Sequence, residues 1–258
     1  MMPHTLAIDV GNTTTHLGLF AGEELVYSFR LASTHTRTFD EAALLFKQVF
    51  ADAGIKPDTI TGSVVGSVVP MMTPLIEEAV TRLCGRRPIM VSHHSKLTIR
   101  LDVPRPEQIG ADRIANAEGF WVEHGQAGIV VDFGTATTFD VISTDGAYIG
   151  GSIAPGIETS GNLLAQKAAQ LFKVSIAEPP SVIGTTTEEA LRSGLFFGAI
   201  GSVDEIVRRI MAQLGGKPKV IATGGLAETI AAGSMAIESV DPVLTLKGLR
   251  HILRNSMG

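Results

Sequence analysis

The stretch Ile8-Asp9-Val10-Gly11-Asn12-Thr13-Thr14-Thr15 recurs in outline as Val131-Asp132-Phe133-Gly134-Thr135-Ala136-Thr137-Thr138. Aspartate, glycine and two threonines coincide, at an offset just under half of the 258 residues. In both copies an apolar, strand-like run precedes the motif, and a strand–turn–strand pattern follows it. The repeat therefore predicts an α/β protein made of two duplicated halves, each with its own mixed sheet.

Each Asp-X-Gly loop has the chemistry of a phosphate site. The glycine allows a tight turn in which successive N–H groups converge on an anion, and threonine hydroxyls add donors. A carboxylate at the end of the strand can hold a cation that balances phosphate charge. For either loop alone, an ordinary hairpin turn explains Asp, Gly and Thr equally well. Two copies facing each other across a cleft favour a phosphate clamp.

Composition and charge narrow the function classes. The net charge is −5 and one cysteine, Cys84, is present, which excludes an intrachain disulfide and a multi-cysteine zinc site. Acidic chains do not favour DNA or membrane surfaces, so we expect no nucleic-acid and no membrane partner. The first residues show no signal-peptide pattern and no apolar run is long enough to span a bilayer, which predicts a soluble, cytoplasmic protein.

Glycine, with 28 residues, is more frequent than in an average protein and forms no short repeat. Collagen is therefore excluded, and the additional glycines are expected at turns and at close backbone approaches. Neither G-x-x-x-x-G-K-[ST] nor G-x-G-x-x-G follows the first strand, so neither a P-loop nor a Rossmann site is indicated. Phosphate binding would then be of the kind seen in actin, sugar kinases and Hsp70. In such proteins the phosphates lie in a central nucleotide cleft between two ribonuclease H-like halves.

Two further segments have both a structural and a functional interpretation. In Gly110-Ala111-Asp112-Arg113, the acid is either a first-turn helix residue or a general base, with Arg113 binding an anionic group. Thr223-Gly224-Gly225 is either a plain strand-to-helix turn or a close approach to a flat ligand such as adenine.

With these motifs in view, the chain resembles type III pantothenate kinase, the ATP-dependent enzyme that begins coenzyme A synthesis in many bacteria. The likeness extends from Asp9 to about Gly225 and is carried by the order and spacing of several segments. These are Asp9 to Thr13, Ser67-Val68-Val69-Pro70, Gly110 to Arg113, Asp132 to Thr138, Gly151-Ser152-Ile153-Ala154-Pro155-Gly156, Gly184 to Gly194 and Thr223-Gly224-Gly225.

The resemblance implies the actin-like ATPase fold, with an N-terminal half over residues 1–112 and a C-terminal half over 113–258. It implies transfer of a phosphoryl group from ATP to pantothenate, giving 4'-phosphopantothenate, with Mg²⁺ or a similar divalent cation and K⁺ or NH₄⁺. Asp112 would be the catalytic proton acceptor. The residues expected to bind ATP and its phosphates are Asp9, Gly11, Asn12, Thr13, Thr14, Thr15, His16 and Thr135.

The same resemblance assigns metal and substrate residues. Asp9 would lie near the divalent metal, and Asp132 would be the ligand of the monovalent cation. The residues expected to bind pantothenate are Val103, Gly110, Ala111, Asp112, Arg113 and Thr187. The threonine that matches Thr187 touches substrate from the partner subunit, which implies a homodimer with the pocket near the interface.

The chain departs from the family pattern at three places. Val103 stands where a tyrosine is frequent, Arg105-Pro106 where Asn-Pro is frequent, and Gly184-Thr185-Thr186-Thr187 where Gly-Lys-Asn-Thr is frequent. Two other functions remain open at this stage. One is a sugar or amino-sugar kinase of the same superfamily, and the other is a non-catalytic transcriptional accessory protein on the same scaffold.

Overall fold

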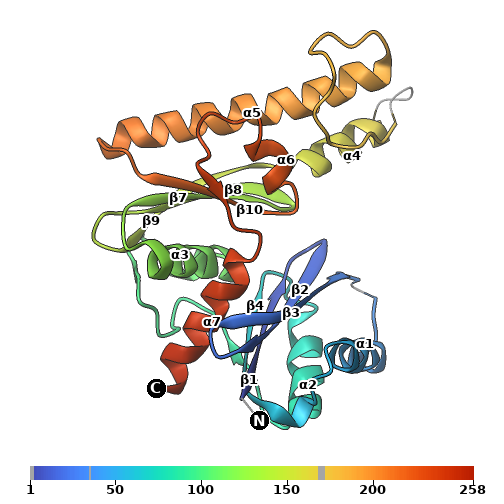
Figure 1. The fold of residues 1–258 in the computed structure, drawn as a ribbon, viewed down its shortest axis with the longest axis vertical. Helices are drawn as coiled ribbons and strands as arrows, with labels where there is room; N and C mark the ends of the chain where they lie inside the picture. The colour runs from blue at the N-terminus through green and yellow to red at the C-terminus, as the bar shows by residue number, and fades with distance from the viewer. Residues whose placement is uncertain (1–2, 35, 168–171) are drawn as a thin grey trace. The chain divides into compact units, whose positions relative to one another are not determined.

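The computed structural model describes residues 3–34, 36–167 and 172–258. The chain forms two compact units, the first made of Met1–His124 and Leu244–Gly258 and the second of Gly125–Val243. Each unit contains a mixed β-sheet with helices packed on it (Figure 1).

The first unit is built on a five-stranded sheet in the order β3-β2-β1-β4-β5. Strands β3, β2 and β1 are antiparallel, whereas β1, β4 and β5 are parallel. The strands are β1 (His4–Val10), β2 (Thr14–Ala21), β3 (Glu24–Ala32), β4 (Ile60–Ser67) and β5 (Ile89–Met90). The helices are α1 (Phe39–Asp52), α2 (Thr73–Cys84), α3 (Ala111–His124) and α7 (Leu244–Met257).

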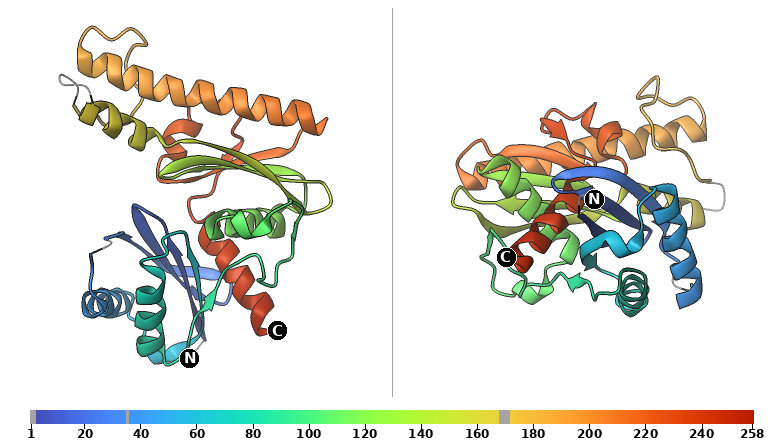
Figure 2. Two further views of the ribbon diagram at one scale, coloured as in Figure 1. Left: turned by 180° about the vertical axis from the view of Figure 1, so that it is seen from behind. Right: turned by 60° about the horizontal axis from the view of Figure 1, so that its bottom comes forward.

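Helices cover both faces of this sheet (Figure 2). Side chains alternate along a strand, so Ile8 and Val10 point to one face and Ala7 to the other. The face of Ile8 packs against Phe46 of α1 and Ile76 of α2. The face of Ala7 packs with residues of α3 and α7. The near-continuous apolar character of β1 and β4 follows from burial on both sides.

The second sheet has six strands, and the five that belong to the second unit repeat the plan of the first sheet in the order β9-β8-β7-β10-β11. Again the first three are antiparallel, and β7, β10 and β11 are parallel. The strands are β7 (Gly128–Phe133), β8 (Ala136–Ile142), β9 (Ala147–Pro155), β10 (Lys219–Gly224) and β11 (Ser239–Val240). The helices are α4 (Ile157–Lys167), α5 (Thr187–Leu214) and α6 (Ala227–Ala231).

One apolar cluster holds this second unit together. Val131 and Phe139 of the sheet pack against Phe196, Val203 and Val207 of α5. Helix α5 begins at a capping box in which Thr186 and Glu189 satisfy each other's backbone N–H groups. It ends at Gly215, which has the left-handed conformation typical of a helix C-terminus.

The matching strand order and direction confirm the duplicated fold predicted from the repeat. Apolar residues at helical spacing in the sequence predict helices over 187–214 and 243–254, and these form as α5 and α7. The sequence also predicts a helix from Ser160 to Phe172, of which α4 is described as far as Lys167, because residues 168–171 lie outside the described part of the chain.

The compact units do not divide the chain where the predicted halves do, at residue 112. Helix α3 includes residue 112 and continues to His124, yet the whole helix belongs to the first unit, as does α7. The two helices approach so closely that a β-carbon on Gly248 would overlap the Ala115 carbonyl. The division at 112/113 follows the sequence repeat and stays a prediction. In the compact units, the C-terminal residues Leu244–Gly258 pack with the first unit.

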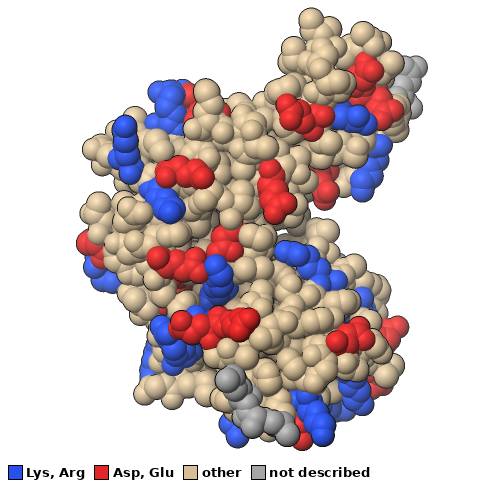
Figure 3. Space-filling view, in the orientation of Figure 1, with Lys and Arg blue, Asp and Glu red and all other residues tan. Residues whose placement is uncertain are grey.

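Charged side chains of both signs are interspersed over the face drawn in Figure 3. Several form exposed pairs one helical turn apart, such as Glu205 with Arg208 and Arg209 on α5. Within residues 3–34, 36–167 and 172–258, the helices are either too short or too polar to cross a bilayer.

Candidate functional site

The first Asp-X-Gly loop is the tip of the β1–β2 hairpin. Val10 is the last paired residue of β1, and the Gly11 N–H donates to the Thr14 carbonyl at 3.1 Å. Asn12, Thr13 and Thr14 are exposed, as expected for residues that contact a ligand. The structure therefore forms the tight glycine turn that the phosphate hypothesis requires.

Thr15 and His16 lie inside strand β2 and are buried, unlike their neighbours at the tip. The hydroxyls of Thr15 and Ser33 are hydrogen-bonded at 2.9 Å. Burial, aided by Arg30, lowers the pKa of His16 from 6.5 to about 4, so the imidazole is neutral at pH 7. A neutral imidazole is a weaker phosphate partner than a charged one. Their assignment to phosphate stays a prediction.

Asp9 is positioned by its two neighbouring strands. It is the last-but-one residue of β1 and pairs with His16 of β2 and Gly66 of β4. Side chains two positions apart in a strand point to the same face of the sheet. The aspartate therefore shares a face with Ala7, which is the face covered by α3 and α7.

The Gly110 to Arg113 segment lies against the same edge of the first sheet. The β-carbon of Ala111 is 3.6 Å from where a β-carbon on Gly66 would stand, and Gly66 is the strand neighbour of Asp9. The segment of the predicted base thus packs against the strand neighbour of the predicted metal ligand within one unit, although Asp9 and Asp112 are 103 positions apart in the sequence.

Asp112 is the second residue of α3 and its carboxylate folds back toward the helix start. Oδ1 accepts the Arg113 N–H at 2.8 Å, and a β-carbon on Gly110 would overlap it. Burial raises the pKa of Asp112, opposed by that N–H and by the Arg113 guanidinium. A carboxylate whose pKa is raised by burial is a stronger proton acceptor, as a general base requires.

The second Asp-X-Gly loop joins β7 to β8. Asp132 pairs with Thr138 on one side and with Thr223 of β10 on the other. The Gly134 N–H donates to the Ala136 carbonyl at 3.0 Å, and Gly134 and Thr135 are exposed. In the first unit the hydrogen bond reaches one residue further, from Gly11 to Thr14, so that loop is one residue longer.

Gly224 brings the end of β10 against this second loop. Its φ is +94°, and a β-carbon there would stand 2.6 Å from both Asp132 Oδ1 and the Phe133 carbonyl oxygen. The next N–H, of Gly225, donates to that same carbonyl at 3.1 Å. The glycine is therefore required by conformation and by space.

The donor sets fit the two predicted cations, each through a single carboxylate. Among the described residues, no group of three or more His, Cys, Asp or Glu side chains could hold a metal ion. Mg²⁺ at nucleotide sites uses one or two carboxylates with phosphates and waters, which suits Asp9 at a strand end. Asp132 Oδ1 and the Phe133 carbonyl both border Gly224, and oxygen donors of this kind suit a hard monovalent cation.

The start of α4 supports the second loop, which the sequence interpretation missed. The Thr159 hydroxyl donates to the Thr135 carbonyl at 2.7 Å. A β-carbon on Gly156 would overlap the carbonyls of Gly134 and Thr135. The sequence Ala154-Pro155-Gly156 by itself predicts a turn, and the tertiary structure places Gly156 against the second loop.

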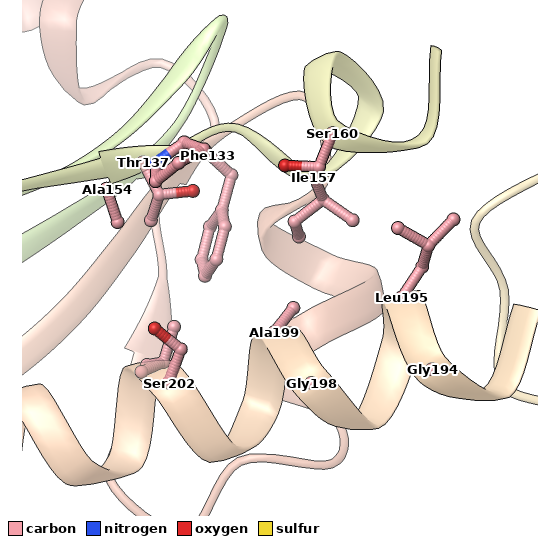
Figure 4. Close-up of a pocket in the computed structure, with 12 residues that line it drawn as sticks. Phe133, Thr137, Ala154, Ile157, Ser160, Gly194, Leu195, Gly198, Ala199 and Ser202 are labelled. Atoms are coloured by element: carbon pink, nitrogen blue, oxygen red, sulfur yellow. The ribbon is translucent and has the colours of Figure 1, made fainter. Parts of the chain in front are cut away.

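A pocket of about 240 Å³ lies beside this loop, between the sheet, α4 and α5 (Figure 4). Phe133 projects into it from the strand that leads to the loop, and Ile157 and Ser160 border it from α4. The α5 side is built mainly of small residues, among them Gly194, Gly198, Ala199 and Ser202.

The remaining predicted substrate residues lie in two places. Val103 is half-buried in the segment between β6 (Arg100–Leu101) and a short 3₁₀ turn at Pro106–Gln108. Thr187 is the exposed first residue of α5, in the second unit. Within the first unit, Ala111 packs against Gly66, the strand neighbour of Asp9, and Gly110 lies next to Val68.

Solved structures share this fold over nearly the whole chain. A protein of Campylobacter jejuni described as a Baf family transcriptional activator aligns with a TM-score of 0.60 and 20% identity, covering 98% of each chain. The ROK hexokinase of Thermus thermophilus aligns at 0.54 and 12% identity, covering 98% of this chain and 99% of its own. MreB 5 of Spiroplasma citri, bound to AMPPNP, aligns at 0.56 and 10% identity over 100% and 98%.

Comparison by sequence identifies the family more narrowly than comparison by fold does. The sequence model of the type III pantothenate kinase family matches residues 5–209. The type III pantothenate kinase of Anaeromyxobacter sp. strain K is 46% identical over 245 residues, which is 95% of this chain and 96% of that protein. The one from Dehalococcoides mccartyi strain ATCC BAA-2266 is 44% identical over 252 residues, or 98% of each.

The duplicated sheets, each with an Asp-X-Gly hairpin, place the chain in the class of proteins with the actin-like ATPase fold, which sugar kinases share. Within that class, the family match and the near full-length relatives assign the chain further. It belongs to the type III pantothenate kinase family.

Proposed function

We propose that this chain transfers the terminal phosphoryl group of ATP to the primary hydroxyl of pantothenate, giving 4'-phosphopantothenate for coenzyme A synthesis. The observation that carries the proposal is the near full-length family membership at 44–46% identity. The sugar-kinase alternative is supported only by fold, at 12% identity to the hexokinase. A single buried free cysteine, Cys84, fits action in the reducing cytoplasm.

The residues of the first unit would divide the chemistry between them. Asp112 accepts the proton of the attacking hydroxyl, and Arg113 pairs with an anionic group of the substrate. The exposed residues at the tip of the Gly11 turn, Asn12, Thr13 and Thr14, bind phosphate oxygens. Asp9 would hold Mg²⁺, which neutralises charge on the transferred group.

The residues of the second unit would bind the rest of the nucleotide. Thr135 contacts ATP from the second loop. Asp132 holds the monovalent cation with help from the Phe133 carbonyl, and the turn at Gly224-Gly225 admits the flat adenine of the nucleotide. This division is supported by the exposure of Thr135 and by the oxygen atoms that border Gly224.

A cation-dependence assay tests the function and the Asp132 assignment together. With pantothenate, ATP and Mg²⁺, we expect turnover in potassium or ammonium buffer to exceed that in sodium-only buffer by about tenfold or more, because a smaller ion fits the same oxygens poorly. Asp132→Asn should lower activity in potassium to the sodium level. A coupled ADP assay measures both, with hexoses as alternative acceptors.

The matched control is Asp145→Asn, in the β8–β9 turn of the same unit. Its side chain caps a hairpin with Ser143, away from the Asp132 loop, and it should keep the cation response. Equal turnover in all three buffers would remove the role of Asp132. Turnover of a hexose with no pantothenate phosphorylation would contradict the function itself.

We also infer a homodimer whose contact surface lies on the second unit. Large apolar side chains are exposed there on α4, on α5 and on the segment before α5, and an exposed apolar group of this kind is typical of an interface. They are Leu163, Leu164, Val182, Ile183 and Phe197. Thr187 begins α5 next to this surface in sequence, which suits a side chain that reaches the partner's substrate.

A hybrid dimer tests this arrangement. Chains carrying Asp112→Asn and chains carrying Thr187→Lys should each be nearly inactive. After co-expression, about half of the dimers are mixed, and each mixed dimer has one site with both native residues, so about a quarter of parental activity should return. Purified tandem-tagged hybrids, with one native site of two, should reach about half of parental activity, with Thr81→Lys on α2 replacing Thr187→Lys as the control. No recovery in a purified hybrid dimer would exclude a contribution of Thr187 across the interface.

A further inference from the structure

The end of β4 contacts both parts of the first-unit site. The Val68 N–H, just past the strand, donates to the Val10 carbonyl at 3.1 Å, directly before the Gly11 turn. On its other side, Cγ1 of Val68 lies 3.2 Å from where a β-carbon on Gly110 would stand. Val68 therefore contacts Val10, directly before the phosphate turn, and Gly110, two residues before Asp112.

The turn that carries Val68 is held by its own hydrogen bonds. The Ser67 hydroxyl oxygen accepts the Val69 N–H at 3.2 Å and the Thr73 hydroxyl at 2.8 Å. The Thr73 hydroxyl also reaches the Val69 carbonyl at 3.0 Å, and Thr73 is the first residue of α2. Because α2 packs in the core of the unit through Ile76 and Val80, the turn is tied to a rigid element.

The contact with Gly110 is close because that residue has no side chain. Asp112 Oδ1 and Val68 Cγ1 both border the space that a side chain on Gly110 would fill, so Val68 packs at the start of α3 beside the Asp112 carboxylate. Polar chemistry is not available at Val68, whose side chain is aliphatic. Its effect on the site can only be one of placement.

We propose that Val68 is a positioning residue that sets the distance between the phosphate turn at Gly11 and the carboxylate of Asp112. The inference rests on the proposed function, in which Asp112 acts on the acceptor hydroxyl. It assigns a task to the Ser67-Val68-Val69-Pro70 segment that substrate contacts do not explain. Loss of the contact should let the start of α3 move, and a misplacement of about 1 Å at a reacting group lowers turnover by up to about a hundredfold.

The test compares Val68→Ala with Val68→Ile in steady-state kinetics. We expect Val68→Ala to lower kcat by about tenfold to a hundredfold and to change the KM for ATP by less than about twofold, because the Gly11 turn keeps its own hydrogen bonds. Val68→Ile keeps both γ-carbons and should restore kcat to within about twofold of the parental value. Val26→Ala, the same change at a half-exposed position of β3, should leave both constants unchanged.

A second variant keeps the test decisive if Val68→Ala does not fold. Ser67→Ala leaves every side chain at Gly110 to Asp112 unchanged but releases the turn, and it should lower kcat selectively by about threefold to tenfold.

Parental kcat in folded Val68→Ala, or in Ser67→Ala where only that variant folds, would overturn the proposal. So would equal losses in kcat and in ATP affinity, which indicate general damage. A parental chain that phosphorylates another alcohol contradicts the proposed function instead, and the Val68 comparison then uses that acceptor.

Discussion

Replacing Asp112 with asparagine should remove most pantothenate phosphorylation, lowering kcat by about 10²–10⁴-fold, which is the usual range for loss of general acid–base catalysis. The amide oxygen can still accept the Arg113 N–H, so the start of α3 should keep its geometry. Binding of ATP, measured by calorimetry, should be nearly unchanged, because the Gly11 turn is untouched.

The same variant should not lose stability. The pKa of Asp112 is raised in the folded chain, so the folded state binds the proton more tightly than the unfolded state does. Ionised Asp112 therefore lowers the free energy of unfolding as pH rises from the unfolded-state pKa to the higher folded-state pKa. Asparagine removes this penalty, and the Tm of Asp112→Asn at pH 7 should equal or exceed that of the parental chain.

Asp58→Asn is the matched control for Asp112→Asn. Asp58 is an exposed acid of the same unit, in the short 3₁₀ turn before β4, and its replacement should leave kcat and Tm unchanged. Parental turnover by a folded Asp112→Asn chain would refute the general-base assignment. Lost turnover together with a lower Tm would indicate that the carboxylate supports structure instead.

The second large effect is expected at Gly224. Alanine there must adopt a φ of +94° and place its β-carbon 2.6 Å from the Phe133 carbonyl oxygen, and neither can be relieved without moving the strand. Strain of this kind costs about 3 kcal/mol, which corresponds to a fall in Tm of roughly 10 °C for a chain of this size. Because Asp132 Oδ1 is also displaced, the response to potassium should weaken.

The neighbouring glycine provides the control for this experiment. Nothing lies within 4 Å of a β-carbon placed on Gly225, and its backbone is not left-handed. Gly225→Ala should therefore keep the parental Tm within about 2 °C. If both variants unfolded at the same temperature as the parental chain, close packing of Gly224 on the second loop would be refuted.

Several features of the fold could be predicted from sequence because short-range patterns carry them. The alternation of apolar residues and the Asp-X-Gly repeat predicted two sheets of one plan, and both sheets contain five strands in the same order, with a sixth strand added to the second sheet. The start of α5 could also be predicted, since Thr186 and Glu189 form a capping box within four residues.

Local patterns were less informative at the loop edges. Thr15 and His16 continue the polar run of the first motif, yet both side chains are buried within β2. The strand register decides this, because Val10 pairs with Thr15 while the corresponding Phe133 pairs with Thr137. A difference of one residue in loop length is invisible in the aligned motifs but changes which side chains face solvent.

The sequence by itself determined that this is a duplicated α/β kinase with two Asp-X-Gly turns and a separate acid at Asp112. Only the tertiary structure decided that β4 brings Gly66 and Val68 against the start of α3, and that α7 packs in the first unit. The physical reason is that these contacts join segments distant in sequence. Their geometry depends on how whole elements pack, which no local pattern of residues specifies.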